Sequence, residues 1–280
     1  VPCLLKQMLQ ATKMVNTDIQ VQDRVLRAGL DYLAKNSWSI SPALLAEAVH
    51  RLVREITGKE DPYFEVKRIA NLEVLEFYPR LKNLVQTHPD PLLAAVKGAI
   101  AGNIIDYAPF ADKMSPGSLD FESIVNDIIN RPFAKDSFLA LKKALMNAET
   151  LLFLADNAGE IVFDRVLLEQ LQAQQENSLD ITFIVKAQPF LNDAMLIDAE
   201  QVGLQNIPNL TLKPMNLPLD SLNPKLLQRF RLSDITISKG QANYELFSEY
   251  SSHFFLLMAK CPVIAQDLGV SVGDLIVYLS

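Results

Sequence analysis

The apolar residues in the first half of the chain recur three or four positions apart, which is the spacing of one face of an α-helix. The pattern extends from residue 3 to about residue 148, and its clearest runs are residues 4–9, 25–33 and 45–56. Asp-Pro pairs at residues 61–62 and 90–91 predict further helix starts, because Asp caps free backbone N–H groups and proline fits the first turn. We expect the first of these helices to reach about residue 85. A break at residues 114–118 then precedes two more helices, at 121–129 and 136–146.

The pattern changes after Thr150, where short apolar runs rich in β-branched and aromatic residues alternate with helical segments. The predicted strands are residues 151–155, 181–185, 210–213, 235–238, 253–258 and 275–279, with helical patterns at 161–171, 194–203 and 222–230. This alternation predicts βαβ units and a mostly parallel sheet, covered on both faces because its strands are apolar throughout. The predicted fold class is α/β, with a helical domain at residues 1–148 and a Rossmann-like domain at residues 149–280.

Polar residues collect immediately after three of the predicted strands. The sequence DNAGE, residues 156–160, follows the first strand; Lys186 and then residues 192–193 follow the second; and KGQANYE, residues 239–245, follows the fourth. In a sheet of this kind the ligand crevice lies beyond the carboxyl ends of the strands. We therefore expect all three clusters to open on one edge of the sheet.

The first two clusters predict a site for a hard cation. Asp156 and the amide carbonyl of Asn157 lie side by side in the sequence, and Asp193 follows the next strand. Together they form an all-oxygen set of the kind that suits Mg²⁺ or Mn²⁺. A second interpretation of DNAGE remains open at this point, in which Asp156 or Asn157 only caps the following helix.

The same clusters contain groups that could hold an anion. Gly159 allows a tight turn into the next helix, whose first N–H groups could bind a phosphate. Lys239 would add a positive charge for that anion, and Gly240 would let the main chain come close to it.

A further polar segment, GNIID, ends the apolar helix pattern of residues 92–100. Asn103 and Asp106 are three residues apart and share one helical face if the helix continues. From spacing alone we favour an ordinary polar helix end.

Composition and charge narrow the classes of function. The net charge of -7, from 26 Lys and Arg against 33 Asp and Glu, disfavours nucleic-acid binding. The two cysteines, Cys3 and Cys261, form no CxxC pair, so the sequence indicates neither a zinc knuckle nor a disulfide framework, and a reducing, cytoplasmic environment fits best. The apolar runs fall short of the roughly 20 residues of a membrane helix. The three histidines are isolated and GxGxxG is absent, so a histidine metal site, a Ser-His hydrolase and ordinary dinucleotide binding are disfavoured.

Several motifs in order carry a resemblance that spans the chain. They are VPCLLKQ, DPYFEVKRIAN, GNIID, DNAGEIVFD, VKAQPFLNDA, SKGQANYE and AKCPVIAQDLGVSVGD. With them the sequence resembles the metal-dependent damage-control phosphatases, the family once called domain of unknown function eighty-nine. The resemblance implies a helical domain packed on a three-layer αβα domain. It also implies hydrolysis of phosphate monoesters of small metabolites, such as sugar phosphates or damaged phosphometabolites, with one bound divalent cation.

The resemblance also implies roles for individual residues. The metal ligands would be Asp156, Asn157 and Asp193, the oxygen set derived above, with Mg²⁺ or Mn²⁺ as the cation and Co²⁺ or Ni²⁺ as further candidates. Lys239 would contact the phosphate, and Asp106 would face the same cavity. The residues expected on the substrate side are Asn103, Asn157, Gly159, Lys186, Lys239, Gly240 and Asn243.

The expected mechanism is in-line attack at phosphorus, with Lys239 and helix N–H groups offsetting the charge that develops. Either a water molecule or an Asp carboxylate could be the nucleophile, and Asp106 or Glu160 could serve as the base. The sequence departs from the family pattern at Ala242, where many members have glycine. It also has a bulky Phe190, which we expect to reshape the substrate pocket.

Three alternatives remain open. A non-catalytic protein that retains the pocket would bind a metal or metabolite without turnover. A methyltransferase that uses S-adenosylmethionine would share the Rossmann-like layout, but DNAGE offers only one of the glycines that an adenosine-binding loop needs. A third possibility is that the helical half is an interaction surface and the polar strand ends are caps. The expected partner is a small phosphorylated metabolite, and the oligomeric state is open.

Overall fold

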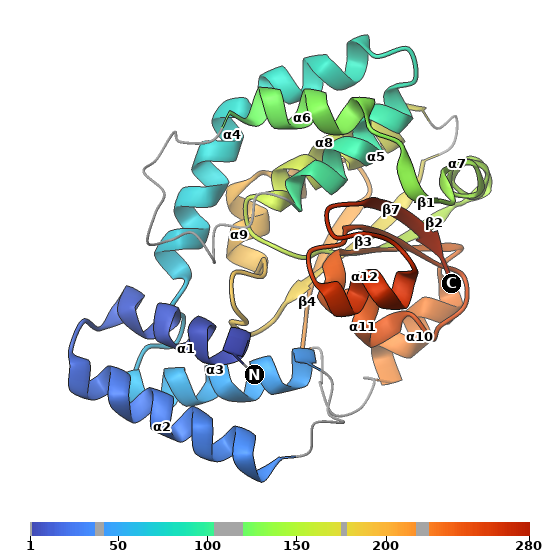
Figure 1. Cartoon of the computed structure of the whole chain (residues 1–280). Coiled ribbons are helices and arrows are strands. Elements are labelled where there is room, and N and C mark those ends of the chain that lie inside the picture. Colours follow the sequence, from blue (N-terminus) through green and yellow to red (C-terminus); the bar gives the residue numbers. More distant parts are fainter. Residues whose placement is uncertain (1, 37–41, 104–119, 175–177, 217–223) are drawn as a thin grey trace.

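The computed structural model describes residues 2–36, 42–103, 120–174, 178–216 and 224–280, and these form three layers beside a small helical unit (Figure 1). A seven-stranded sheet is the middle layer. Helices α4 to α9 pack on one face of the sheet and helices α10 to α12 pack on the other. Each of these two groups shares one apolar core with the sheet. The predicted α/β class with helices on both faces is therefore confirmed.

The sheet is mostly parallel. Its strands are β1 (Phe133–Asp136), β2 (Thr150–Leu154), β3 (Asp180–Lys186), β4 (Leu210–Met215), β5 (Ile235–Lys239), β6 (His253–Met258) and β7 (Leu275–Leu279). They lie in the order β1-β7-β6-β5-β2-β3-β4, and among these pairs only β6 and β7 run antiparallel. All six predicted strands are present. Because β5, β2 and β3 are parallel neighbours, their carboxyl ends meet at one edge.

The sequence pattern missed β1. This strand has four residues with alternating burial and pairs in parallel with β7. Its FAKD sequence contains Lys135 and Asp136, so it lacks the continuous apolar run by which the other strands were recognised. The helix predicted from Asp136 begins instead at Phe138, whose N–H donates to Asp136 Oδ1 at 2.9 Å.

The helices on the first face begin close to where capping residues predict. They are α4 (Phe64–Thr87), α5 (Pro91–Gly102), α6 (Phe121–Asn130), α7 (Phe138–Asn147), α8 (Glu160–Gln174) and α9 (Leu196–Gln201). Asp90 caps α5 by accepting the N–H of Leu93 at 3.0 Å, and Asp61 accepts the N–H of Tyr63 at 2.9 Å just before α4. The break predicted at residues 114–118 lies outside the described residues.

The second face is covered by α10 (Pro224–Leu232), α11 (Gly240–Phe247) and α12 (Pro262–Leu268). The sequence predicted α10 but not the other two. Both missed helices are short, and α11 begins inside KGQANYE, whose polar residues hide the helical period. Ala242 is half-buried within α11, where a helical backbone does not need glycine.

The first three helices form a unit with its own apolar core. They are α1 (Pro2–Val15), α2 (Ile19–Lys35) and α3 (Pro42–Thr57), and all three were predicted. Phe190 and Leu191, from the loop after β3, pack against this core, and Arg54 of α3 donates to the carbonyl of Pro189 at 3.0 Å. Phe190 thus contacts the helical unit, whereas the sequence analysis expected it to shape the substrate pocket.

The division at residues 148 and 149 stays a prediction. The apolar core of α4, α5 and α6 is continuous with that of α8 and the sheet, and β1 adds a strand from before residue 148. The helices within the described ranges are all too short or too polar to cross a membrane.

Each of two buried histidines contributes a loss of stability in mild acid. Burial lowers the pKa of His50 to about 3 and that of His253 to about 4, against an ordinary value of 6.5. At these two positions the unfolded chain therefore binds protons between about pH 6.5 and 4 that the folded chain rejects, and their contribution to the free energy of unfolding falls as the pH is lowered through this range. The raised pKa values of the buried carboxyl groups at residues 156 and 164 act in the opposite direction.

We expect His50→Leu to reduce the loss of unfolding free energy between pH 7 and pH 5 by about 2 kcal/mol. Leucine suits a site that is 2 % exposed, where Nε2 has no hydrogen-bond partner among the described residues. Urea unfolding of the variant and the parent at both pH values measures the difference. If the free energy of unfolding depends on pH equally in the two proteins, the lowered pKa of His50 is contradicted.

Candidate active site

The structure brings the three polar clusters together at the carboxyl edge of the sheet, as predicted. Asn157 and Asp193 form an antiparallel β-bridge. The N–H of Ala194 donates to the carbonyl of Asp156 at 2.8 Å, and the N–H of Ala158 donates to the carbonyl of Asn192 at 2.9 Å. The loops after β2 and β3 are thus joined through their backbones, and the β5 end lies beside them.

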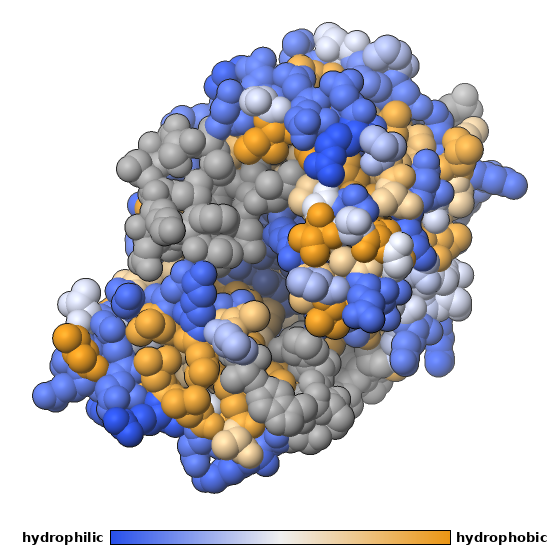
Figure 2. Space-filling view, in the orientation of Figure 1, coloured by the Kyte–Doolittle hydropathy of each residue, from blue (hydrophilic) through white to orange (hydrophobic). Residues whose placement is uncertain are grey.

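The surface is hollowed next to this region. Figure 2 shows the hollow between the α1–α3 unit and the rest of the molecule, with hydrophilic residues around its opening. The loop after β3 reaches α3 on this side of the molecule. A ligand in the hollow would therefore lie near the carboxyl edge of the sheet.

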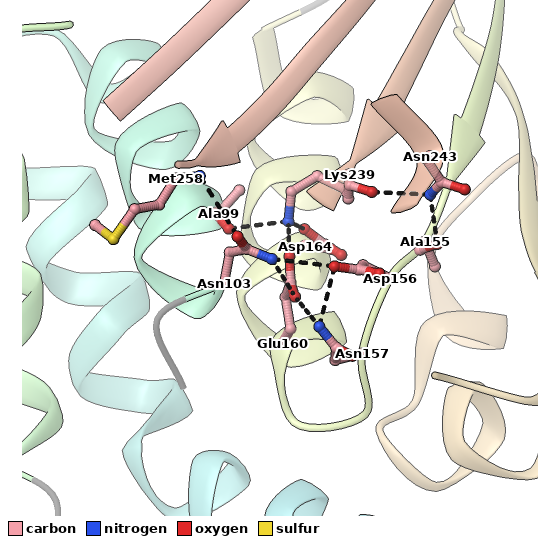
Figure 3. Close-up of polar contacts among 10 residues, drawn as sticks. All are labelled: Ala99, Asn103, Ala155, Asp156, Asn157, Glu160, Asp164, Lys239, Asn243 and Met258. Carbon is pink, nitrogen blue, oxygen red and sulfur yellow. Dashed lines mark hydrogen bonds and ion pairs between the residues drawn. The ribbon is translucent and has the colours of Figure 1, made fainter. Parts of the chain in front are cut away.

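Asp156, Asn157 and Glu160 are linked by amide hydrogen bonds (Figure 3). The Nδ2 group of Asn157 donates to Asp156 Oδ2 at 3.0 Å and to Glu160 Oε2 at 3.1 Å. Asn103, at the end of α5, donates to the same two oxygens at 3.1 and 3.2 Å. All four side chains are buried. Asn103 therefore faces the cluster, as the resemblance implied, whereas Asp106 lies outside the described residues.

Lys239 lies beneath this cluster rather than facing a substrate. Its ammonium is fully buried and contacts Glu160 Oε1 at 2.6 Å, Asp164 Oδ1 at 2.6 Å and the carbonyl of Ala99 at 2.9 Å. These contacts use all three N–H donors of the group. The direct phosphate contact expected for Lys239 is therefore corrected, because two carboxylates on the first turns of α8 draw the side chain inward.

Asn243 contacts the backbone at the ends of two strands. It is 1 % exposed, and its Nδ2 donates to the carbonyls of Ala155 at 3.0 Å and Lys239 at 2.8 Å. Both donors therefore tie the ends of β2 and β5 together. The Oδ1 of the same amide has no hydrogen-bond partner among the described residues, and the expected substrate contact of Asn243 stays a prediction.

Lys186 contacts a predicted metal ligand. Its ammonium lies 3.2 Å from Asp193 Oδ2, and its side chain is 12 % exposed. With Lys239 withdrawn beneath the site, Lys186 is a cation that remains beside the predicted metal ligands.

Burial and crowded charges set the protonation of the carboxyl groups. Burial raises the pKa of Asp156 well above its ordinary value, and the charges of Glu160 and Asp193 add to this shift, against weaker opposition from Lys260 and Lys186. Burial also disfavours the charged form of Glu160, but the charge of Lys239 and its hydrogen bond hold the pKa of Glu160 below its usual range.

The other carboxyl group that contacts Lys239 responds differently. Burial raises the pKa of Asp164 to about 7, with Glu160 adding to the shift and Lys239 opposing it. Asp164 Oδ2 is buried without a hydrogen-bond partner in the described part of the chain. Burial therefore disfavours the charged forms of all three carboxyl groups, and nearby lysines overcome this effect at Glu160 but not at Asp156 or Asp164.

The donor set fits a divalent cation. Asp156, Asn157 and Asp193 are 7 %, 7 % and 3 % exposed and lie on loops that are bonded to each other. Two buried carboxylates and an amide carbonyl suit a hard cation, whose charge would favour the ionised form of Asp156 against burial, which is the main cause of its raised pKa, and against the repulsion that adds to it. Within the described ranges no three His, Cys, Asp or Glu side chains cluster as metal ligands, so the set depends on Asn157.

Three residues that shape the site could not be identified from the sequence pattern. Asp164 was hidden in an apolar helix, although its spacing of four from Glu160 places both on one face. The charge of Lys260, which follows β6, acts on both Asp156 and Glu160. Asn71 of α4 accepts the N–H of Gly159 at 2.7 Å, and no local pattern connects these two residues.

Comparisons with known proteins agree on one family. The model of the damage-control phosphatase ARMT1-like domain matches residues 1–276. A damage-control phosphatase of Archaeoglobus fulgidus is 32% identical over 282 residues, which cover 98% of this chain and 95% of that protein. An uncharacterized protein of Methanocaldococcus jannaschii is 30% identical over 286 residues, covering 97% of this chain and 91% of its own. A crystal structure of a DUF89 family protein from Pyrococcus horikoshii matches with a TM-score of 0.87 at 27% identity, over 99% of this chain and 96% of that one.

Glycine at position 240 is required by a close approach. Its φ is +75°, and an added Cβ would lie 1.8 Å from Asp156 Oδ2. We expect Gly240→Ala to displace Asp156 and to lower the free energy of unfolding by about 3 kcal/mol or more. Gly269→Ala is the matched control, because Gly269 has a φ of +67° but no atom within 4 Å of the added Cβ. It should lose only about 1 kcal/mol. Equal losses in urea unfolding would contradict the steric argument.

The burial of Lys239 predicts a large cost for removing its charge. Lys239→Met would leave Glu160 and Asp164 buried without their cation, and we expect a loss of about 3–5 kcal/mol in unfolding free energy. Lys82→Met is the control, since Lys82 lies at the same 2.6 Å from Glu169 but its side chain is 40 % exposed. That variant should lose about 1 kcal/mol or less. Similar losses of unfolding free energy in the two variants would contradict a buried ion cluster of Lys239 with Glu160 and Asp164.

Proposed function

The chain belongs to the family of damage-control phosphatase ARMT1-like domains, and from this premise we propose that it is a divalent-metal-dependent phosphatase. It hydrolyses phosphate monoesters of small metabolites, such as sugar phosphates or damaged phosphometabolites. The observation that carries this proposal is the buried pairing of Asp156 and Asn157 with Asp193 at the carboxyl edge of the sheet. Two relatives that match nearly the whole chain carry the name damage-control phosphatase.

In this proposal Asp156, Asn157 and Asp193 hold the cation. Mg²⁺ and Mn²⁺ suit their oxygen atoms best, and Co²⁺ and Ni²⁺ are further candidates. When bound, the cation supplies Lewis-acid polarisation of a phosphoryl oxygen and offsets negative charge at the phosphorus.

The side chains of the site then divide the remaining tasks. Lys186, beside Asp193, supplies positive charge for the phosphate. Glu160 keeps the amide groups of Asn103 and Asn157 oriented, because its Oε2 accepts from both. Lys239 keeps Glu160 ionised and fixed from below.

The attacking group is still open between a water molecule and an Asp carboxylate. Both carboxylate oxygens of Glu160 are engaged, Oε1 by Lys239 and Oε2 by amides, which argues against Glu160 as the base. Asp106 remains the candidate base, although it lies outside the described residues. A small phosphorylated metabolite as partner and a cytoplasmic location belong to the same proposal.

Metal-dependent turnover is the direct test. Metal-stripped protein should not hydrolyse a generic monoester such as p-nitrophenyl phosphate, and addition of Mg²⁺, Mn²⁺, Co²⁺ or Ni²⁺ should restore hydrolysis. We expect Asp156→Ala to lower the restored kcat/KM by about 100-fold or more, because a ligand to the cation is lost.

Asp234→Ala is the control for this test. Asp234 precedes β5 at the opposite edge of the sheet, where it accepts the N–H groups of Glu149 and Thr150, so its loss should leave turnover intact. Turnover without added metal, or an active Asp156→Ala, would refute the proposed mechanism. Metal binding without turnover would favour the non-catalytic alternative.

A further inference from the structure

Asn71 is a polar residue buried in the middle of α4, outside the proposed ligand set. It is 0 % exposed, and its side chain bonds to three groups from other parts of the chain. Its Oδ1 accepts the N–H of Gly159 at 2.7 Å, and its Nδ2 donates to Asp198 Oδ1 at 3.0 Å and to Gln201 Oε1 at 2.9 Å. A buried amide with every bond directed away from its own helix connects separate segments of the fold.

The first segment is the turn that carries Asp156 and Asn157. Gly159 has a φ of +78°, and α4 packs so closely on it that an added Cβ would lie 3.2 Å from the Cβ of Ala70. Since α8 begins at Glu160, the N–H of Gly159 has no partner within that helix. Asn71 satisfies this N–H and thereby fixes the peptide that follows the two ligand residues.

The second segment is the start of α9, which follows Asp193. Asp198 Oδ2 accepts the N–H of Met195 at 2.9 Å, and Met195 is only two residues after Asp193. Its charge is balanced by Lys67 of α4, which lies 3.5 Å from Asp198 Oδ2 and 2.6 Å from Asp61 Oδ2. The bond from Asn71 to Asp198 therefore holds the second ligand loop against the same helix.

We propose that Asn71 is a positioning residue that sets the separation of the two ligand loops and thereby tunes the affinity of the site for its cation. This inference rests on the proposed function for its cation. Residues that orient metal ligands typically change metal affinity 10- to 100-fold when they are removed. Asp198 connects Asn71 to a buried charge, because its Oδ1 accepts from Asn71 and its Oδ2 lies near the ammonium of Lys67.

The test compares Mn²⁺ affinity of metal-stripped proteins by isothermal titration calorimetry. We expect Asn71→Ala to weaken binding about 10- to 100-fold. Val74→Ala is the matched control, because Val74 is equally buried in α4 but packs into the apolar core. It should lose stability and keep the wild-type affinity.

Exchanging the amide and the carboxylate between positions 71 and 198 provides a second test if Asn71→Ala folds poorly. Asn71→Asp retains an acceptor for the N–H of Gly159 but places a second carboxylate against Asp198, so this single variant should bind Mn²⁺ at least about 10-fold more weakly. In the double variant Asn71→Asp with Asp198→Asn, the amide at 198 can donate to the carboxylate at 71 and still accept from Met195. We expect its affinity to return to within a few-fold of the wild type.

Hydrogen exchange in the metal-free proteins separates this inference from the proposed function. Asn71→Ala should speed exchange in the peptide that contains Gly159, and Val74→Ala should not. If the wild type does not bind Mn²⁺, the proposed function fails, and the exchange result alone decides the role of Asn71. Unchanged affinity together with unchanged exchange at Gly159 overturns the positioning role, as does a double variant no tighter than Asn71→Asp.

Discussion

The ion cluster of Lys239, Glu160 and Asp164 is the interaction on which the rest of the site depends. It joins the end of β5 to the first turns of α8, and through the carbonyl of Ala99 it also reaches α5. All three side chains are fully buried, so their charges are poorly screened and each needs the others. The cluster positions Glu160, and Glu160 in turn orients the amides around Asp156.

The cluster also leaves the site with a surplus of negative charge. One ammonium faces two carboxylates, and Asp156 and Asp193 lie close by, with Lys186 in contact with Asp193. Burial is the main cause of the raised pKa of Asp156, and the charges of Glu160 and Asp193 add to it. The buried cluster thus favours the binding of the proposed cation, and the loops after β2 and β3 carry its predicted ligands. The fold and the proposed chemistry are therefore parts of one electrostatic arrangement.

Much of the fold could be predicted from the sequence, because the relevant signals are local. Apolar runs identified six strands, and Asp-Pro pairs marked the starts of α4 and α5. The meeting of residues 156 and 193 followed from a general property of parallel sheets. In contrast, β1 was missed because FAKD has no continuous apolar run. Position along a strand placed Lys239 at the correct edge, but it could not tell which way a long side chain would turn. Asp164 and Asn71 lie in helices whose partners are distant in sequence.

The loop between β3 and Asp193 belongs to two parts of the molecule at once. Its residues Phe190 and Leu191 complete the core of the α1–α3 unit, and two positions later Asp193 bridges to Asn157. This shared loop constrains how the sequence can evolve. A substitution in α3 that improves the packing of the small helical core also changes the surface on which Phe190 packs. Because the same loop carries Asp193, such a change would affect the predicted metal ligand and be subject to selection. The N-terminal helices should therefore drift in sequence together with residues 189–193, even though none of the helices supplies a ligand.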